Sequence, residues 1–282
     1  MEDGCGRVFS PLVLLNLVCL DAPLVAVSWA WLFAHSFEIP VARSGAIALF
    51  LSAWLIYLAD RFGDSLALRP DAPTSLRQRF CLQHRATWIV AMIAVAVADL
   101  FVVVKGIEFR TLVSGAALGI FALAYLMVNQ TRPSLWRRVP LKEVCIGFLF
   151  AAGTVVPLAA SLTSGAWLGW LLFALLCSLN CVCIAVWERD LDQAQGRVSI
   201  ATEFPMAERL ILVSLGLIGL SCAILAVLAP TAWSPYVAIG VSAGLLAAVH
   251  VYRVGIGGDV RTALADLVLL TPLFVWAVTG LA

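Results

Sequence analysis

Residues 86–104 read ATWIVAMIAVAVADLFVVV and contain a single charged side chain, Asp99. A helix needs roughly 18–20 mostly apolar residues to cross the hydrocarbon core of a bilayer, so this stretch is typical of a membrane span. Stretches of the same kind recur along the chain. They predict an all-α polytopic membrane protein with nine transmembrane helices, over residues 11–34, 43–60, 86–104, 111–128, 144–162, 166–187, 209–229, 234–252 and 262–281.

The composition agrees with this class of protein. Of 282 residues, 62% are hydrophobic and 12% are charged, whereas soluble domains carry about 25% charged residues. No Ser/Gly-rich linker divides the chain, so we expect one transmembrane domain over residues 1–282. The basic residues lie between the apolar stretches and form no separate basic domain, so we expect a lipid bilayer and no nucleic acid among the partners.

The Lys and Arg residues also predict an orientation. With nine spans and a cytoplasmic N-terminus, fifteen of the eighteen basic residues fall in cytoplasmic segments, and only Arg43, Lys105 and Arg110 fall outside. Cytoplasmic loops of membrane proteins carry this excess of positive charge. The chain is therefore expected to place its N-terminus in the cytoplasm and its C-terminus outside.

A first pair of acids closes the second expected span, where residues 54–64 read WLIYLADRFGD. Asp60 and Asp64 are four residues apart, so a continuing helix puts them on one face. Two like charges at this spacing repel each other, and a divalent cation between them removes the repulsion. The alternative is a solvated helix end that Arg61 neutralises.

A second pair closes the sixth expected span, where residues 180–192 read NCVCIAVWERDLD. Glu188 and Asp192 have the same spacing, and Asn180 continues their face into the membrane. Asp190 points elsewhere and is expected to be a solvated partner of Arg189.

The two pairs share their spacing, their expected membrane side and the arginine-rich loops that follow them. Carboxylates near the hydrocarbon are costly unless they are paired or bind a metal. Mg²⁺ prefers carboxylate and phosphate oxygens, so four converging acids suit a diphosphate held through Mg²⁺. We therefore predict a cytoplasm-facing active site with Mg²⁺ as the cofactor and these catalytic, metal-binding residues: Asp60, Asp64, Glu188 and Asp192.

These motifs resemble those of the UbiA superfamily of intramembrane prenyltransferases. The first motif of that family reads N-D-x-x-D-R-x-x-D, and residues 56–64 here read IYLADRFGD. The second resembles D-x-x-x-D-x-x-x-G-x-x-S/T, and residues 188–199 here read ERDLDQAQGRVS. Arg137-Arg138 is similar to a basic pair before the fifth family helix, and Asp21-Ala-Pro23 to an acidic-x-Pro element in the first. Ile56 and Tyr57 replace the leading Asn and Asp, and of these two only Tyr57 can donate a hydrogen bond to phosphate.

The resemblance implies nine helices around a central cavity and a Mg²⁺-dependent prenyltransferase. Such an enzyme transfers an isoprenyl group from an isoprenyl diphosphate donor to an aromatic or lipid acceptor, which is hydrophobic. The residues expected to bind the diphosphate are Arg61, Arg85, Arg137, Arg138, Lys142 and Tyr57. Those expected to line the substrate pocket are Asp21, Asn180, Trp54 and Trp187.

Two other functions remain open from the sequence. Intramembrane acids also serve coupling ions in transporters, although no inverted repeat is evident. The loss of the leading Asn and Asp also fits a non-catalytic protein that retains the fold.

Overall fold

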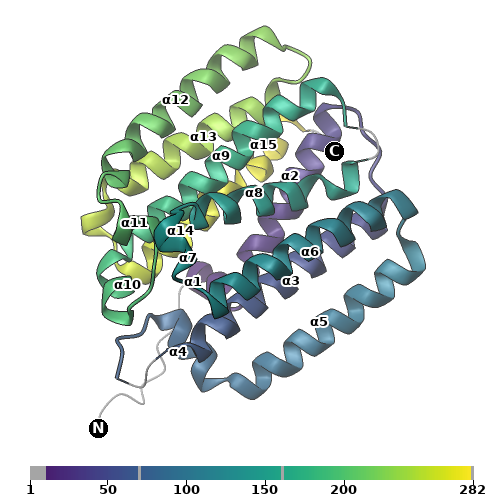
Figure 1. The fold of residues 1–282 in the computed structure, drawn as a ribbon. Coiled ribbons are helices and arrows are strands. Elements are labelled where there is room, and N and C mark those ends of the chain that lie inside the picture. Colours follow the sequence, from purple (N-terminus) through teal and green to yellow (C-terminus); the bar gives the residue numbers. More distant parts are fainter. Residues whose placement is uncertain (1–10, 69–70, 160–161, 281–282) are drawn as a thin grey trace.

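The computed structural model describes residues 11–68, 71–159 and 162–280, and within these ranges the chain is helical and contains no β-strand (Figure 1). The longer helices are α2 (Asp21–Ser36), α3 (Arg43–Leu66), α5 (Arg85–Gly106), α6 (Phe109–Thr131), α8 (Lys142–Val155), α9 (Ser164–Trp187), α12 (Ala207–Leu228), α13 (Trp233–Val251), α14 (Gly258–Leu267) and α15 (Thr271–Thr279). The shorter ones are α1 (Pro11–Leu17), α4 (Leu76–Gln83), α7 (Leu135–Arg138), α10 (Arg189–Gln195) and α11 (Ile200–Glu203), with 3-10 turns η1 (Val156–Leu158), η2 (Arg253–Gly255) and η3 (Val268–Leu270).

The helices are those of a multi-pass membrane protein. In the described ranges, seven helical stretches are long and apolar enough to cross a membrane, and α1 with α2 makes an eighth if this bent pair is one span. The fifth expected span, residues 144–162, corresponds to α8 and η1. Because α8 has only 14 residues, it falls short of the length of a full span, and the predicted count of nine is not confirmed.

The first expected span, residues 11–34, is not one straight helix. Its two parts, α1 and α2, meet at an angle of 93°. Pro23 explains the break, because its ring would clash with the carbonyl of Cys19 in a continuous helix, and Cys19 instead adopts φ 58°. The Trp54 indole donates a hydrogen bond of 3.0 Å to the Val18 carbonyl, which the break leaves free.

The last expected span, residues 262–281, is also interrupted. Here η3 separates α14 from α15, and Pro272 removes the N–H that would bond to the Val268 carbonyl. Ser242 of α13 supplies the missing donor, with its Oγ at 2.7 Å from that carbonyl oxygen. The helix can therefore break inside the bundle without leaving this backbone group unpaired.

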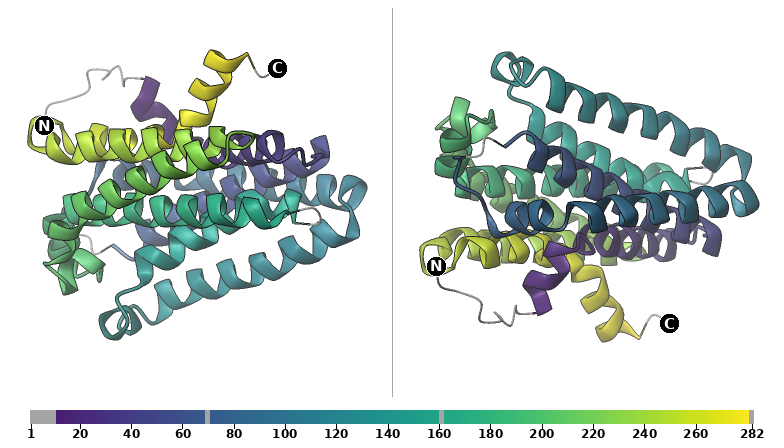
Figure 2. Two further views of the ribbon diagram at one scale, coloured as in Figure 1. Left: turned by 90° about the horizontal axis from the view of Figure 1, so that it is seen from above. Right: turned by 90° about the horizontal axis from the view of Figure 1, so that it is seen from below.

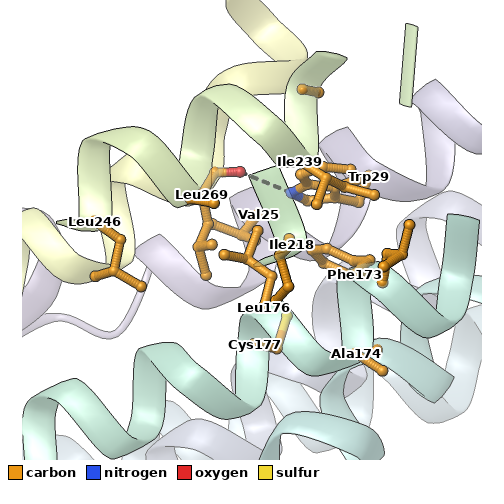
Figure 3. Close-up of a cluster of buried hydrophobic side chains, with 14 of the residues drawn as sticks. Val25, Trp29, Phe173, Ala174, Leu176, Cys177, Ile218, Ile239, Leu246 and Leu269 are labelled. Carbon is orange, nitrogen blue, oxygen red and sulfur yellow. Dashed lines mark hydrogen bonds between the residues drawn. The ribbon is translucent and has the colours of Figure 1, made fainter. Parts of the chain in front are cut away.

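The main core lies around α9, between α2, α12 and α13. Trp29 stacks on Phe173 with ring centroids 4.1 Å apart, and its indole donates to the Leu269 carbonyl at 2.7 Å (Figure 3). By contrast, α5 and α6 lie at the edge of the molecule (Figures 1 and 2), and their apolar side chains are largely exposed. Such surfaces suit contact with lipid.

Candidate functional site

The first acidic pair lies on one continuous helix, as predicted, since α3 extends past the expected end of the span at residue 60 to Leu66. Asp64 is held by Arg197, whose Nη1 lies 2.8 Å from Oδ2 and whose Nη2 lies 2.8 Å from the Asp64 carbonyl oxygen. The Oδ1 atom of Asp60 is buried and has no hydrogen-bond partner among the described residues.

Arg197 reaches Asp64 because α10 ends in a tight turn. Gly196 adopts φ 70°, a left-handed conformation that strains any residue with a Cβ. The N–H of Arg197 then turns back and bonds to the Asp192 carbonyl at 2.8 Å. The turn therefore positions Arg197 against α3, and its signal in the sequence is the glycine of the second motif.

The second acidic pair lies where α9 meets α10. Glu188 joins the two helices, and the N–H of Asp192 bonds to its carbonyl at 2.8 Å, which preserves the helical spacing of the pair. Both carboxylate oxygens of Glu188 lie 2.6 Å from Nη2 of Arg77, and Thr262 Oγ1 lies 3.2 Å from Oε1.

The two ion pairs are reciprocal. Arg77 belongs to α4, which follows the first acidic pair, and binds an acid of the second pair; Arg197 follows the second pair and binds an acid of the first. The Gln78 and Gln195 side chains add two hydrogen bonds, of 3.2 and 2.9 Å, between the same segments. As a result, α4 and α10 lie together at one end of the bundle (Figure 1).

Lys142 and Arg197 lie near the remaining two acids, Asp60 and Asp192. Both basic side chains lie within electrostatic range of Asp60 and also of Asp192. Burial raises the pKa of Asp192 above its ordinary value, and the nearby Ser199, Lys142 and Arg197 side chains partly offset this rise. The structure therefore brings the two acidic stretches together around shared basic side chains.

A fifth acid, which sequence reasoning missed, lies beside this group. Glu143, in the first turn of α8, is buried and accepts a hydrogen bond of 3.0 Å from the N–H of Ile200. Its Oε2 is buried without a hydrogen-bond partner among the described residues. Its place next to Lys142 in an otherwise apolar stretch was the available signal.

The six residues expected to bind diphosphate separate into two groups. Arg61, Tyr57 and Lys142 belong to the site: the Arg61 guanidinium lies 5.2 Å from the centre of the Tyr57 ring, and Arg61 lies within electrostatic range of Asp60. The other three are exposed and lie away from these contacts. Arg137 pairs with Glu203 at 3.9 Å, and Arg85 and Arg138 form no ion pair within the described part of the chain.

Two of the expected pocket residues join a buried polar cluster at the helix breaks. Asn16 Nδ2 donates to Asp21 at 2.6 Å and to Asp266 at 3.0 Å, and Asn180 Nδ2 donates to Asp266 at 3.3 Å. The cluster joins α1, α2, α9 and α14. Polar side chains inside apolar stretches are the sequence signal for Asn16 and Asp266.

The other two pocket residues and Arg189 have different partners. Trp54 closes the α1–α2 break, and the Trp187 indole donates to His250 Nδ1 at 3.1 Å. The predicted pairing of Arg189 with Asp190 is wrong. Arg189 pairs with Glu208 at 3.5 Å, because α12 brings that carboxylate alongside, while Asp190 is exposed.

The carboxylates at this end fit Mg²⁺ shared with an anion. Among the described residues, no three His, Cys, Asp or Glu side chains gather closely enough to hold a metal ion. Mg²⁺ commonly takes only one or two carboxylates and completes its shell with water and substrate phosphate oxygens. Asp60 and Asp64, one helical turn apart, supply that number of ligands, and Asp60 Oδ1 has no competing partner.

Comparisons with known proteins address the fold. No protein-family profile and no curated protein sequence matches the chain. Among solved structures, the chain is similar to the apo structure of a UbiA homolog from Aeropyrum pernix K1. The TM-score is 0.53 over 93% of this chain and 99% of that chain, at 16% sequence identity. The chain therefore has a UbiA-like all-helical fold, and at this identity the similarity carries no residue roles.

Proposed function

We propose that the protein is a membrane-embedded, Mg²⁺-dependent prenyltransferase that transfers an isoprenyl group from an isoprenyl diphosphate to an aromatic or lipid acceptor. The observation that carries the proposal is the reciprocal pairing of Asp64 with Arg197 and of Glu188 with Arg77. This pairing gathers acids and arginines from two distant stretches at one end of an apolar bundle. A donor with an anionic head and an apolar tail matches such a place, and the UbiA-like fold supports the assignment.

The charges at this end explain the expected need for Mg²⁺. Five carboxylates face four basic side chains there, so a diphosphate with several negative charges would be repelled unless cations accompany it. The acids are Asp60, Asp64, Glu143, Glu188 and Asp192, and the bases are Arg61, Arg77, Lys142 and Arg197.

The reaction itself needs little from the protein beyond charge and position. The bond between C1 of the isoprenyl group and the diphosphate oxygen breaks, and its electron pair leaves with the diphosphate. The acceptor then bonds to the allylic cation and releases a proton. When bound, Mg²⁺ supplies Lewis-acid stabilisation of the leaving diphosphate.

The side chains of the site would act on the leaving group. Asp60 with Asp64, and Glu188 with Asp192, are proposed to hold one Mg²⁺ ion each, so that each ion takes no more than two carboxylates. Arg77 and Arg197 would exchange their carboxylates for phosphate oxygens, for which the planar guanidinium is well suited. Arg61 and Lys142 add positive charge where the diphosphate gains negative charge, which lowers the barrier.

We also propose that the site faces the cytoplasm, with the N-terminus inside and the C-terminus outside. The excess of Lys and Arg in alternate loops supports this orientation.

The test is a binding and turnover assay on purified protein in nanodiscs. With Mg²⁺, we expect calorimetry to detect binding of geranylgeranyl diphosphate and of inorganic diphosphate, and we expect EDTA to abolish both. Asp60→Ala and Asp192→Ala should each remove this binding, whereas the exposed Asp190→Ala should not. Comparing lipid extracts of cells with and without the gene by mass spectrometry should reveal a missing prenylated product. Equal binding by all three variants would contradict the proposal.

One observation favours a transporter as a second candidate. Two broken helices meet at a buried pair of acids, Asp21 and Asp266, which Asn16 bridges. Discontinuous helices with polar groups at the break are typical of ion-coupled carriers. Ion or substrate flux in proteoliposomes without diphosphate turnover would favour this function.

A further inference from the structure

An apolar groove runs along the outside of the bundle between α6 and α8. Its volume is about 490 Å³. The groove reaches the surface that faces lipid, since Phe121 on its rim is 67% exposed. Side chains from both helices line it, among them Phe121, Ala124 and Val128 of α6 and Cys145, Leu149 and Ala152 of α8.

Two of the side chains that line the groove also carry unpaired hydrogen-bond donors. The Tyr125 hydroxyl and the Trp136 indole N–H are buried, and neither has a hydrogen-bond partner among the described residues. Their rings lie 5.8 Å apart. Burying a donor without an acceptor is unfavourable, so this pair points to a ligand that accepts hydrogen bonds.

The same donors lie near the acidic site. The Tyr125 hydroxyl is within electrostatic range of Asp60, Asp64 and Glu143. Trp136 lies in α7, the short helix that precedes Lys142 at the start of α8. The groove thus runs from the acidic end of the bundle toward Trp170, along one side of the bundle.

We propose that this groove binds the isoprenyl tail of the donor, while Tyr125 and Trp136 donate hydrogen bonds to its diphosphate. The inference rests on the proposed function and adds the path of the tail. A bilayer acyl chain would fill the apolar part but would leave both donors unpaired. An isoprenyl diphosphate satisfies both parts, because its oxygens accept hydrogen bonds and its tail is apolar.

The groove has a limited length. From Cys145 to Ala152, seven residues at 1.5 Å rise give about 10 Å along α8. A longer tail would extend beyond Trp170 and Phe121 into lipid. Affinity should therefore increase with tail length until the groove is filled and then level off.

The experiment measures Mg²⁺-dependent binding to the full chain in nanodiscs for inorganic diphosphate and for isoprenyl diphosphates of increasing length. Ala152→Leu and Ala124→Leu narrow the groove and should weaken binding of the tailed ligands about tenfold while leaving inorganic diphosphate unchanged. The matched control is Ala98→Leu on the exposed face of α5, which should bind every ligand as the wild type does.

Tyr125→Phe tests the donor separately. Loss of a hydrogen bond to a charged group should weaken binding of all ligands about tenfold, inorganic diphosphate included. If the hydroxyl has no ligand role, removing an unpaired buried group should only raise the melting temperature. Unchanged affinity in Tyr125→Phe would therefore overturn the assignment of this donor.

The outcomes separate the two proposals. If inorganic diphosphate binds but affinity does not depend on tail length, or Ala152→Leu matches the wild type, the tail lies elsewhere and the proposed function survives. If wild-type protein binds neither kind of ligand, both proposals fail. A diazirine at the tail end should label α6 or α8. If excess phospholipid removed that label as effectively as excess unlabelled isoprenyl diphosphate does, the groove would be a lipid-chain site and the inference would be overturned.

Discussion

The Arg197–Asp64 pair should contribute measurably to stability in the absence of metal. Arg197 makes two hydrogen bonds of 2.8 Å to Asp64, and the two side chains are only 23% and 24% exposed. Hydrogen bonds to charged groups contribute about 1.5–3 kcal/mol, whereas exposed ion pairs contribute about 0–1 kcal/mol. For this partly buried pair, we expect Arg197→Ala to lower the free energy of unfolding by about 2 kcal/mol in EDTA.

Mg²⁺ should reverse this loss. Without Arg197, the carboxylates of Asp60 and Asp64 lie one helical turn apart with one counter-charge fewer, so a divalent cation meets less competition there. A ligand that binds only the folded state stabilises it by about 2.7 kcal/mol at a concentration of 100 Kd. Saturating Mg²⁺ should therefore restore most of the stability of the variant and should stabilise it more than it stabilises the wild type.

The assay is unfolding in mixed detergent micelles, followed by tryptophan fluorescence, with EDTA or with Mg²⁺. Arg137→Ala is the matched control, because its pair with Glu203 spans 3.9 Å and its side chain is 63% exposed, so its loss should cost under about 0.5 kcal/mol. If Arg197→Ala were as stable as this control in EDTA, or gained no more from Mg²⁺ than the wild type, the proposed exchange between arginine and metal would be wrong.

Two further predictions concern packing and burial. Gly147 of α8 packs directly on the Ser178 backbone of α9, so Gly147→Ala should destabilise the protein by about 1–3 kcal/mol in thermal melts. The control is Gly119→Ala, because an added Cβ there meets nothing within 4 Å, and this change should be neutral or should stabilise the protein by about 0.5–1 kcal/mol. Burial raises the pKa of the Cys81 thiol, and less thiolate at a given pH means slower alkylation. Peptide mass spectrometry at pH 8 should find Cys81 alkylated at least about tenfold more slowly in the folded protein than in the unfolded chain. Equal rates would show that α4 opens freely.

Much of the fold could be predicted from the sequence because apolar length is a local property. The apolar stretches correspond to helices, and Asp60 and Asp64 share one of them. The breaks were missed because a proline inside a long apolar stretch is tolerated in membrane helices when other groups satisfy the freed carbonyls. Only the tertiary structure shows that Ser242 and Trp54 do so at Val268 and Val18.

The acids of the site could be recognised, but their arginine partners could not. Acid spacing is set within one helix turn, whereas Arg77 and Arg197 act on carboxylates more than a hundred residues away. In the sequence these arginines look like any other basic residues of the segments between apolar stretches. Arg85 and Arg138 were expected in the site although they are exposed, because charge alone does not show which way a side chain at a helix end faces.

The reciprocal ion pairs also bear on how a site of this kind would bind its ligands. Arginine and Mg²⁺ would compete for Asp64 and Glu188, so metal alone should bind weakly to the wild-type protein. Diphosphate alone should also bind weakly, because the carboxylates repel it and already engage the arginines. When both arrive together, each arginine can exchange a carboxylate for a phosphate oxygen while Mg²⁺ takes the freed carboxylate, so every charge keeps a partner. Bound Mg²⁺ should therefore raise the affinity for diphosphate, and bound diphosphate should raise the affinity for Mg²⁺ by the same factor. This exchange of partners would keep the arginines paired both before and after the donor binds.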